Sequence, residues 1–232
     1  MRKHDKPARN SSSSNKAGSK PATAGGRTDR DRAVYLAASW CLSYPDQEVL
    51  ERLPLIRSVL KRHPGVGEDF EPVLAHLSSG TPMDVQTRYV KEFDLGKRHA
   101  LHLSYWTDGD TRRRGEVLGA FKQVYRRSDF LVDTHGELPD YLPMVLEFAA
   151  RVDVDAGRDL LIQYRPSLEM LRLGLLDDKL PHTRILQAIC DTLPGKSPAD
   201  QQAVMKMAGY GPPTESVGLE PYDPRLLPLK GT

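Results

Sequence analysis

Residues 137–149 have the sequence ELPDYLPMVLEFA, and this stretch decides the fold class. Leu138, Pro139 and Asp140 form a helix start signal, because proline is tolerated in the first turn and an acid favours the N-terminal end. The apolar residues that follow recur at helical spacing, at Leu142, Val145, Leu146 and Ala149. The stretch therefore predicts an amphipathic helix with one buried face.

Apolar residues keep the helical period through most of the chain. We expect further helices at about 29–44, 46–62, 69–78, 81–94, from 111 onward, at 154–173 with an interruption near Pro166, and at 180–193. Residues 95–110 break the pattern and indicate an irregular loop. Because no stretch alternates with the period of two that a strand requires, the sequence predicts an all-α, single-domain bundle of about eight helices.

Several helix starts carry capping residues. Candidate N-caps are Asp29 or Asp31, Asp46, and Thr81, which is followed by Pro82 and Asp84. Gly115 and Gly119 lie one turn apart in the helix after residue 111, so we expect them to allow close packing of a neighbouring helix.

The composition places part of the chain outside a core. Of 232 residues, 39% are hydrophobic and 28% are charged. Residues 1–28 are rich in serine, glycine and basic residues and predict a disordered tail; residues 29–195 are the predicted helical domain; residues 196–232 are proline-rich and predict a flexible tail. No apolar run is long enough to cross a membrane, and the N-terminus lacks the apolar region of a secretory signal. Two cysteines give no disulfide framework, so we expect a soluble, cytoplasmic protein.

The net charge of +2 is unevenly distributed. Residues 1–32 hold nine Lys and Arg against three Asp, which leaves the remainder of the chain acidic. An acidic body argues against nucleic acid as the main partner and suits a basic peptide. A regulatory protein that uses its basic N-terminal arm on nucleic acid stays open as an alternative.

Polar and ionisable residues are densest at 92–115, where one interpretation is a metal site of a helical hydrolase. Its ligands would be His99, His102, Asp108 and Asp110. The simpler interpretation is a hydrogen-bonded loop that caps the next helix through Asp110 or Thr111. Cys41 lies on an apolar helix face and predicts a buried, inert thiol. No set of nucleophile, base and orienting group stands out, which favours a binding protein over an enzyme.

Two segments are unusual for a purely structural helical domain. Residues 105–112 put Trp106 in a polar loop, and residues 137–143 put two prolines around an acid and an aromatic. Aromatic, acidic and arginine side chains on loops are typical of peptide grooves. The alternative is that Trp106 fills the core and the prolines only set the helix start.

Three runs, at 89–95, 103–115 and 137–148, resemble the nitrate reductase molybdenum cofactor assembly chaperones, the NarJ-type delta subunits within the TorD-like group of molybdoenzyme chaperones. The resemblance covers roughly residues 30–195. The Pro-Asp-x-Leu-Pro element at 139–143 with the following Leu-Glu-Phe is similar to the group's hallmark, except that Tyr141 stands where histidine is common.

The resemblance implies an all-helical, TorD-like, cytoplasmic protein that is not an enzyme. It implies binding of the apo catalytic (alpha) subunit of membrane-bound respiratory nitrate reductase through that subunit's N-terminal segment. The chaperone would support insertion of bis-molybdopterin guanine dinucleotide before membrane docking, without binding this cofactor stably. Possible further partners are molybdenum cofactor biosynthesis proteins; nucleic acid and stable membrane association are not expected, and the expected state is a monomer.

We expect the client's apolar face to lie against Tyr89, Phe93, Tyr105 and Leu142, and its basic groups to meet Glu92, Asp94, Asp108 and Asp140. The full set of candidate client-binding residues is Tyr89, Glu92, Phe93, Asp94, Tyr105, Trp106, Asp108, Asp110, Arg112, Pro139, Asp140, Tyr141, Leu142 and Glu147. Replacing Asp108 or Asp140 is expected to weaken binding without harming the fold. The C-terminal tail either folds over this groove as a competitor or is solvated.

Overall fold

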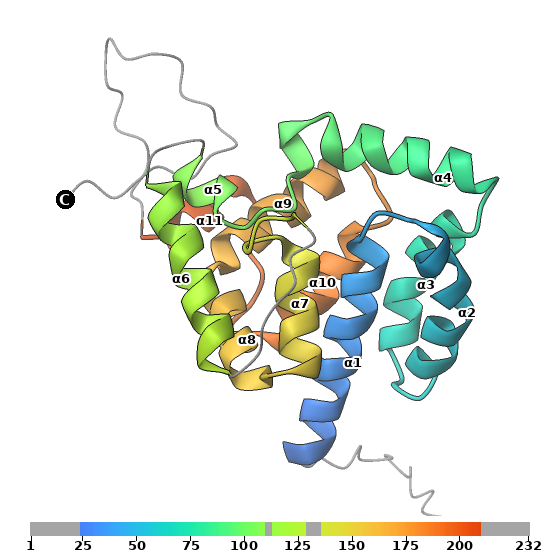
Figure 1. Cartoon of the computed structure of the whole chain (residues 1–232), viewed down its shortest axis with the longest axis horizontal. Helices are drawn as coiled ribbons and strands as arrows, with labels where there is room; N and C mark the ends of the chain where they lie inside the picture. The colour runs from blue at the N-terminus through green and yellow to red at the C-terminus, as the bar shows by residue number, and fades with distance from the viewer. Residues whose placement is uncertain (1–23, 110–112, 129–135, 210–232) are drawn as a thin grey trace, which may run out of the picture.

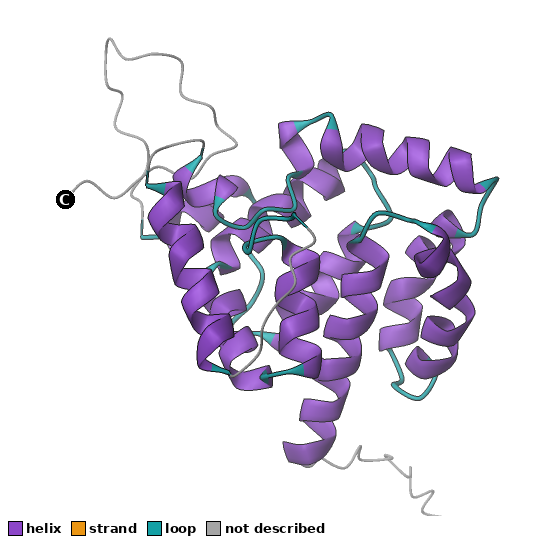
Figure 2. Cartoon of the chain, in the orientation of Figure 1, coloured by secondary structure: helices purple, strands orange, loops and turns teal. Residues whose placement is uncertain are grey.

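The structure is a computed structural model, and it describes residues 24–109, 113–128 and 136–209 (Figure 1). In this part of the chain the regular backbone is helical throughout, with no strand (Figure 2). The elements in order are α1 (Ala24–Leu42), α2 (Gln47–Leu60), α3 (Val66–Leu77), α4 (Pro82–Tyr89), the π-helix η1 (Val90–Asp94), the 3-10 helix η2 (Lys97–His99), α5 (Tyr105–Asp108), α6 (Arg114–Arg127), α7 (Leu142–Arg151), α8 (Val154–Gln163), α9 (Arg165–Asp177), α10 (Thr183–Thr192) and α11 (Gln201–Met207).

The all-α class is confirmed, but the predicted number of helices, about eight, was too small. The segment predicted at 154–173 is two helices that meet at Tyr164, and α5 and α11 were missed because each is short and lies in a proline- or loop-like context. Among the described residues, none of the helices is both long and apolar enough to cross a membrane.

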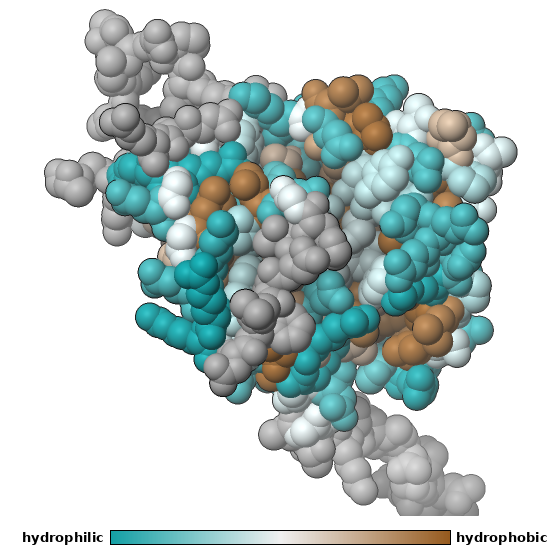
Figure 3. All heavy atoms as spheres, viewed as in Figure 1, coloured by the Kyte–Doolittle hydropathy of each residue, from teal (hydrophilic) through white to brown (hydrophobic). Residues whose placement is uncertain are grey.

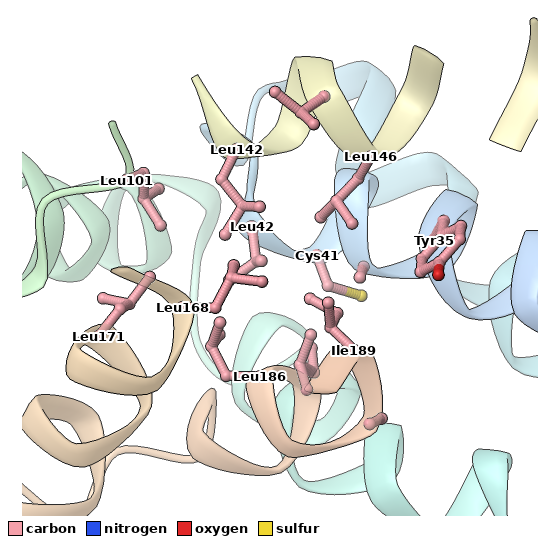
Figure 4. Close-up of a cluster of buried hydrophobic side chains, with 14 of the residues drawn as sticks. Tyr35, Cys41, Leu42, Leu101, Leu142, Leu146, Leu168, Leu171, Leu186 and Ile189 are labelled. Atoms are coloured by element: carbon pink, nitrogen blue, oxygen red, sulfur yellow. The ribbon is translucent and has the colours of Figure 1, made fainter. Parts of the chain in front are cut away.

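Helix α1 is the centre of the bundle, with α7 on one side and α2 and α3 on the other (Figure 1), and it also contacts α10. Figure 4 shows how the core forms where α1, α7, α9 and α10 converge. Leu42, Leu142, Leu168 and Leu186 meet there with no exposed surface. The hydroxyl of Ser39 on α1 donates to the carbonyl of Pro143 at 2.8 Å, which fixes the first turn of α7 against α1.

Two of the local start signals are confirmed, whereas α7 begins at Leu142, later than the start predicted from Leu138, Pro139 and Asp140. Asp46 accepts from the amide of Val49, and Thr81 and Asp84 form a reciprocal capping box around Pro82. The start of α1 was predicted wrongly, since the helix begins at Ala24 and neither Asp29 nor Asp31 caps it. Asp31 is instead buried on α1, where its carboxylate lies 3.5 Å from Arg158.

Helices α7 and α8 approach each other closely at Gly157. A Cβ at that position would lie 2.4 Å from the Cβ of Ala149. Only glycine therefore allows this crossing. In contrast, Gly115 and Gly119 on α6 face open space, so the expected close packing at those two residues is wrong.

A buried ion triad ties the segment after α10 to α9. Glu169 is fully buried and pairs with Arg165 and Arg172, at 3.4 and 2.7 Å. Arg165 also donates to the carbonyls of Pro194 and Gly195, and Arg172 to that of Pro198. These contacts position the chain for α11, which packs on α9.

The boundaries of the predicted tails differ from the described helices at both ends. At the C-terminal side, residues 201–207 of the predicted flexible tail form α11, which Asp200 caps and which buries Val204 and Met205. At the N-terminal side, residues 24–28 belong to α1. Tail residues 1–23 and 210–232 lie outside the described part of the chain.

Candidate functional site

A pocket of about 590 Å³ opens where the segment from α4 to α5 meets the turn before α7. Its lining is Tyr44, Tyr89, Phe93, Asp94, Leu95, Gly96, Lys97, Ala100, Leu101, His102, Tyr105, Glu137 and Tyr141. Apolar surface is exposed over the η1 end of α4 (Figure 3), where Leu95 is 79% exposed. Leu95 is also one of the lining residues, so it adds an apolar side chain to the rim of the pocket.

The π-helix η1 sets the direction of the side chains at the pocket. Its wider turn follows directly on α4, and such π-turns often occur at functional sites. Phe93 points into the protein and is buried, while Asp94, the next residue, is exposed at the rim. The turn therefore presents an aromatic ring and a carboxylate side by side.

Two tyrosine hydroxyls meet at the pocket. The hydroxyl of Tyr89 donates to the carbonyl of Leu42 at 3.0 Å and lies 3.1 Å from the hydroxyl of Tyr141. Burial is the largest cause that raises the pKa of Tyr141, to about 12. Burial likewise raises the pKa of Tyr89. Both hydroxyl groups are therefore neutral at physiological pH and take part as hydrogen-bonding groups.

Aromatic rings form the pocket wall. Tyr44 meets Tyr89 edge-on with centroids 5.5 Å apart, and Tyr89 packs on Phe93 at 4.9 Å. Tyr44 is 43% exposed, so one of these rings is open to a ligand. Such a wall offers apolar contact and a ring face to a bound segment.

Asp140 organises the loop behind the pocket rather than the pocket itself. Its carboxylate is fully buried and accepts from the amide and the hydroxyl of Ser104 and from His102, with Arg114 at 3.7 Å. Burial alone would raise the pKa of Asp140, but the hydrogen bonds from His102 and Ser104 outweigh it, and the pKa lies below its usual value. An isolated bridge between His102 and Tyr141 completes the junction.

The structure brings five of the predicted site residues together in the pocket: Tyr89, Phe93, Asp94, Tyr105 and Tyr141. Four others are buried away from solvent, namely Trp106, Pro139, Asp140 and Leu142. Trp106 donates to the carbonyl of Ala100 at 3.0 Å, so it fills the core, as the simpler interpretation had it. The expectation that Asp140 could be replaced without harm to the fold is contradicted by its burial and its partners.

The remaining predicted residues lie elsewhere. Glu92 faces inward, 3.9 Å from His76 and 3.8 Å from His182, and burial raises its pKa. Asp108 accepts from Thr107, and Glu147 pairs with Arg151 on the outside of α7. Asp110 and Arg112 lie outside the described residues, as does Thr111.

Sequence reasoning missed several pocket residues: Tyr44, Leu95, Lys97, His102 as a lining residue, and Glu137. Tyr44 is distant in sequence and reaches the pocket only because α1 ends beside α4. Leu95 had one usable signal, a large apolar side chain between two turn residues, Asp94 and Gly96.

The metal interpretation finds no support in the described part of the chain, where no three His, Cys, Asp or Glu are placed to hold an ion. His99 lies 3.0 Å from Asp178, whereas His102 is bonded to Asp140. The two histidines therefore contact different carboxylates in different segments and do not form one site. Cys41 is buried, as predicted, and burial raises the pKa of its thiol to about 12.

Comparison with known proteins gives consistent findings. Residues 61–166 match the family model for the nitrate reductase delta subunit. The chain is 33% identical over 170 residues to the protein of Bacillus subtilis (strain 168) named "Probable nitrate reductase molybdenum cofactor assembly chaperone NarJ", covering 72% of this chain and 90% of that one. It is 41% identical over 160 residues, 68% of its length, to "Nitrate reductase-like protein NarX" of Mycobacterium tuberculosis (strain ATCC 25618 / H37Rv), of which it spans only 24%.

A solved structure from Archaeoglobus fulgidus, described as a redox enzyme maturation protein, has the same fold. The TM-score is 0.52 at 17% identity, and the match covers 69% of this chain and 91% of that one. Every pocket residue except Tyr44 lies inside the segment that matches the family model.

Proposed function

Because the chain belongs to the nitrate reductase delta subunit family, the NarJ-type molybdenum cofactor assembly chaperones, we propose that it binds the apo catalytic subunit of a membrane-bound respiratory nitrate reductase. The family consists of chaperones and not of catalysts. In this proposal the chain holds the N-terminal segment of its client, keeps the client open for bis-molybdopterin guanine dinucleotide, and is absent from the finished enzyme.

The observation that carries the proposal is the aromatic pocket within the family-matched segment. Tyr89, Phe93, Tyr105 and Tyr141 line it, and Leu95 and Tyr44 extend its apolar surface outward. Exposed apolar residues around buried rings are the usual anchor for an amphipathic segment laid into a groove. The pocket's size suits a few side chains, so it would hold the anchoring part of the client and not a whole domain.

The cofactor is a cargo of the client in this proposal. No residue of this chain is assigned to it. By holding the N-terminal segment, the chaperone would delay membrane docking until the cofactor is in place. It would act as a monomer in the cytoplasm, with cofactor biosynthesis proteins as possible further partners.

The test is calorimetric titration with a synthetic peptide of about the first 30 residues of the catalytic subunit from the same organism. We expect micromolar or tighter binding. Leu95→Asp should weaken it at least tenfold, because a charge would face the bound apolar side chain. Leu55→Asp is the matched control, since Leu55 on α2 is 63% exposed and lies outside the pocket.

The proposed function fails if the peptide does not bind. If the peptide binds and both variants bind it like the unmodified chain, the pocket is not the binding site. Equal loss in both variants would place the interaction outside the pocket and contradict the site. Circular dichroism on each variant is the control that checks whether the helices remain intact.

A further inference from the structure

Basic side chains gather on α6, which lies at the outer edge of the bundle (Figure 1). Residues 113–127 hold five Lys and Arg against one acid, although the chain beyond residue 32 is acidic as a whole. Arg114 turns inward and donates to the hydroxyl of Ser104 at 3.3 Å. The other four bases, all exposed, are Arg113, Lys122, Arg126 and Arg127. Among the residues that the structure describes, none of these four side chains has an ion pair or a hydrogen bond.

The opposite face of α6 fixes the helix to the body. Phe121 packs on Tyr164 with ring centroids 4.8 Å apart, and Tyr125 packs on Phe148 at the same 4.8 Å. The hydroxyl of Tyr125 also donates to the carbonyl of Pro139 at 2.6 Å. Because these contacts use one side of the helix, its basic side faces solvent from a fixed element.

The four free bases lie in two rows along the exposed face. Because an α-helix turns by about 100° per residue, Lys122 and Arg126 lie one turn apart on one side of this face. Arg113 and Arg127 lie on the other side, at its two ends. Gly119 lies between the rows, and a Cβ at that position would meet no atom within 4 Å. Hydrophilic side chains gather over α6 in Figure 3, so this face is a low strip between two rows of cations.

A partner for this face must bring negative charge to both rows. Side chains four residues apart on a helix lie about 5–6 Å from each other, so acids on a helix laid along α6 recur at the spacing of Lys122 and Arg126. The open space at Gly119 lets the backbone of such a helix approach. The 14 residues of α6 extend over about 21 Å, which accommodates about four turns of a partner helix.

We propose that the exposed face of α6 is the docking surface for an acidic helix of a partner protein. Free guanidinium and ammonium groups form charge-assisted hydrogen bonds with carboxylates, and arginine does so through two parallel bonds. Complementary charge also speeds the encounter and excludes basic partners. No residue of α6 lines the aromatic pocket, so this surface goes beyond the proposed function, and a client segment and a second partner can bind at the same time.

The charge around α6 favours a protein helix over a membrane or a nucleic acid. Helix α8 lies beside α6, where Ser128 donates to Asp153 at 3.1 Å, and it exposes Asp155 and Asp159. A membrane or a DNA duplex presents negative charge over a wide area, so it would also meet these acids, whereas a single helix faces only the strip. The middle of the strip, at Gln123, has no large apolar side chain that would insert into lipid.

The test uses the full chain and a synthetic probe. The probe is a stapled, alanine-rich helix of about four turns with glutamates four residues apart on two sides, and its neutral counterpart has glutamine at the same positions. We expect the glutamate helix to bind at submillimolar concentration in low salt, to weaken as the salt concentration rises, and to shift the backbone NMR signals of α6 rather than those of the pocket. Equal binding of the two helices would overturn the proposal.

Double variants of the chain locate the binding. Lys122→Gln/Arg126→Gln and Arg113→Gln/Arg127→Gln should each weaken the glutamate helix about fivefold, the combined effect of two exposed ion pairs. Circular dichroism checks that both variants keep their helices. Normal binding by both double variants would show that α6 is not the docking surface.

The control for net charge is Lys16→Gln/Lys20→Gln, which removes the same charge from the basic N-terminal segment. It should bind the glutamate helix like the unmodified chain. A loss equal to that of the α6 variants would reduce the effect to net charge and overturn the docking surface.

The shape of the strip is tested at Gly119. Gly119→Leu puts a side chain in the path of the partner and should weaken the glutamate helix about tenfold, whereas Gly119→Ala should change its binding little. Because nothing in the chain lies within 4 Å of the added Cβ, both variants should melt no lower than the unmodified chain. Normal binding by Gly119→Leu would contradict the close approach of a helix.

Phosphatidylserine vesicles and a DNA duplex separate the classes of partner. We expect both to bind more weakly than the glutamate helix and to be insensitive to the α6 double variants. If either binds more tightly and loses its binding in those variants, the partner is a membrane or a nucleic acid and the acidic helix is wrong. Because none of these probes is the client peptide, such a failure leaves the proposed function standing.

Discussion

The carboxylate of Asp140 accepts a hydrogen bond from the backbone amide of Ser104 at 3.0 Å, across 36 residues of sequence. This contact joins the loop that ends in α5 to the turn before α7, and both segments line the pocket on their outer side. Asp140 therefore holds together two segments that line the pocket, although its own side chain does not line it.

Asp140→Asn is expected to destabilise the fold by about 2–4 kcal/mol, since it removes a buried charge whose partners include Arg114 and His102. Because the pKa of Asp140 is lowered in the folded state, its contribution is present above the usual Asp pKa and is lost as the pH falls through the folded value. Urea unfolding at several pH values measures this. Asp159→Asn is the control, and equal stability of the two variants would contradict the structural role.

Gly157→Ala should be one of the most damaging single-methyl changes in the chain. The added Cβ would lie 2.4 Å from that of Ala149, so α7 and α8 must separate, at a cost of about 1–3 kcal/mol. Gly119→Ala is the matched opposite, because it lies inside α6 with open space around it and should stabilise by about 0.5–1 kcal/mol. Thermal melts of both variants should move in opposite directions; melts that move together would refute the packing argument.

His182 should make stability depend on pH. Burial lowers its pKa to about 3, and within residues 24–109, 113–128 and 136–209 neither ring nitrogen has a hydrogen-bond partner. The unfolded chain binds this proton below about pH 6.5 and the folded chain does not, so the free energy of unfolding falls as the pH drops from 6.5 towards 3. The slope approaches about 1.4 kcal/mol per pH unit for the one proton.

The groups that face His182 modify this dependence. His76, with its pKa also lowered by burial, adds to it, whereas the raised pKa of Glu92 acts in the opposite sense. His182→Phe keeps an aromatic ring against Phe93. The variant should reduce the slope of the unfolding free energy against pH by the contribution of the one proton that His182 binds. A variant with an unchanged slope between pH 6.5 and 5 would show that His182 is not the titrating group.

Local signals were enough for most of the fold. The capping box at Thr81 and Asp84 and the period of Leu142, Val145 and Leu146 depend on neighbours within a turn, so the sequence alone predicts them. The pocket depends on relationships that no local rule contains. Asp94 and Asp140 both lie beside aromatic residues in the sequence, but one ends a π-helix at the surface and the other is enclosed by Ser104 and its neighbours.

The C-terminal segment offers the sharpest comparison of two truncated chains. A chain that ends at Gly195 loses α11, with the buried Val204 and Met205, and the carbonyl of Pro198 that accepts from Arg172. It should lose about 2–5 kcal/mol, because apolar burial is lost and a buried guanidinium beside Glu169 loses a partner. A chain that ends at Gly209 keeps every one of these contacts and should unfold like the full chain.

The longer of the two truncated chains also tests the tail as a competitor for the pocket. If residues 210–232 do not cover the pocket, it binds the client peptide as tightly as the full chain in calorimetry, which is the result we expect. Tighter binding after their removal would instead identify this segment as an internal competitor. Equal stability of both truncated chains would contradict the role of α11 in the fold.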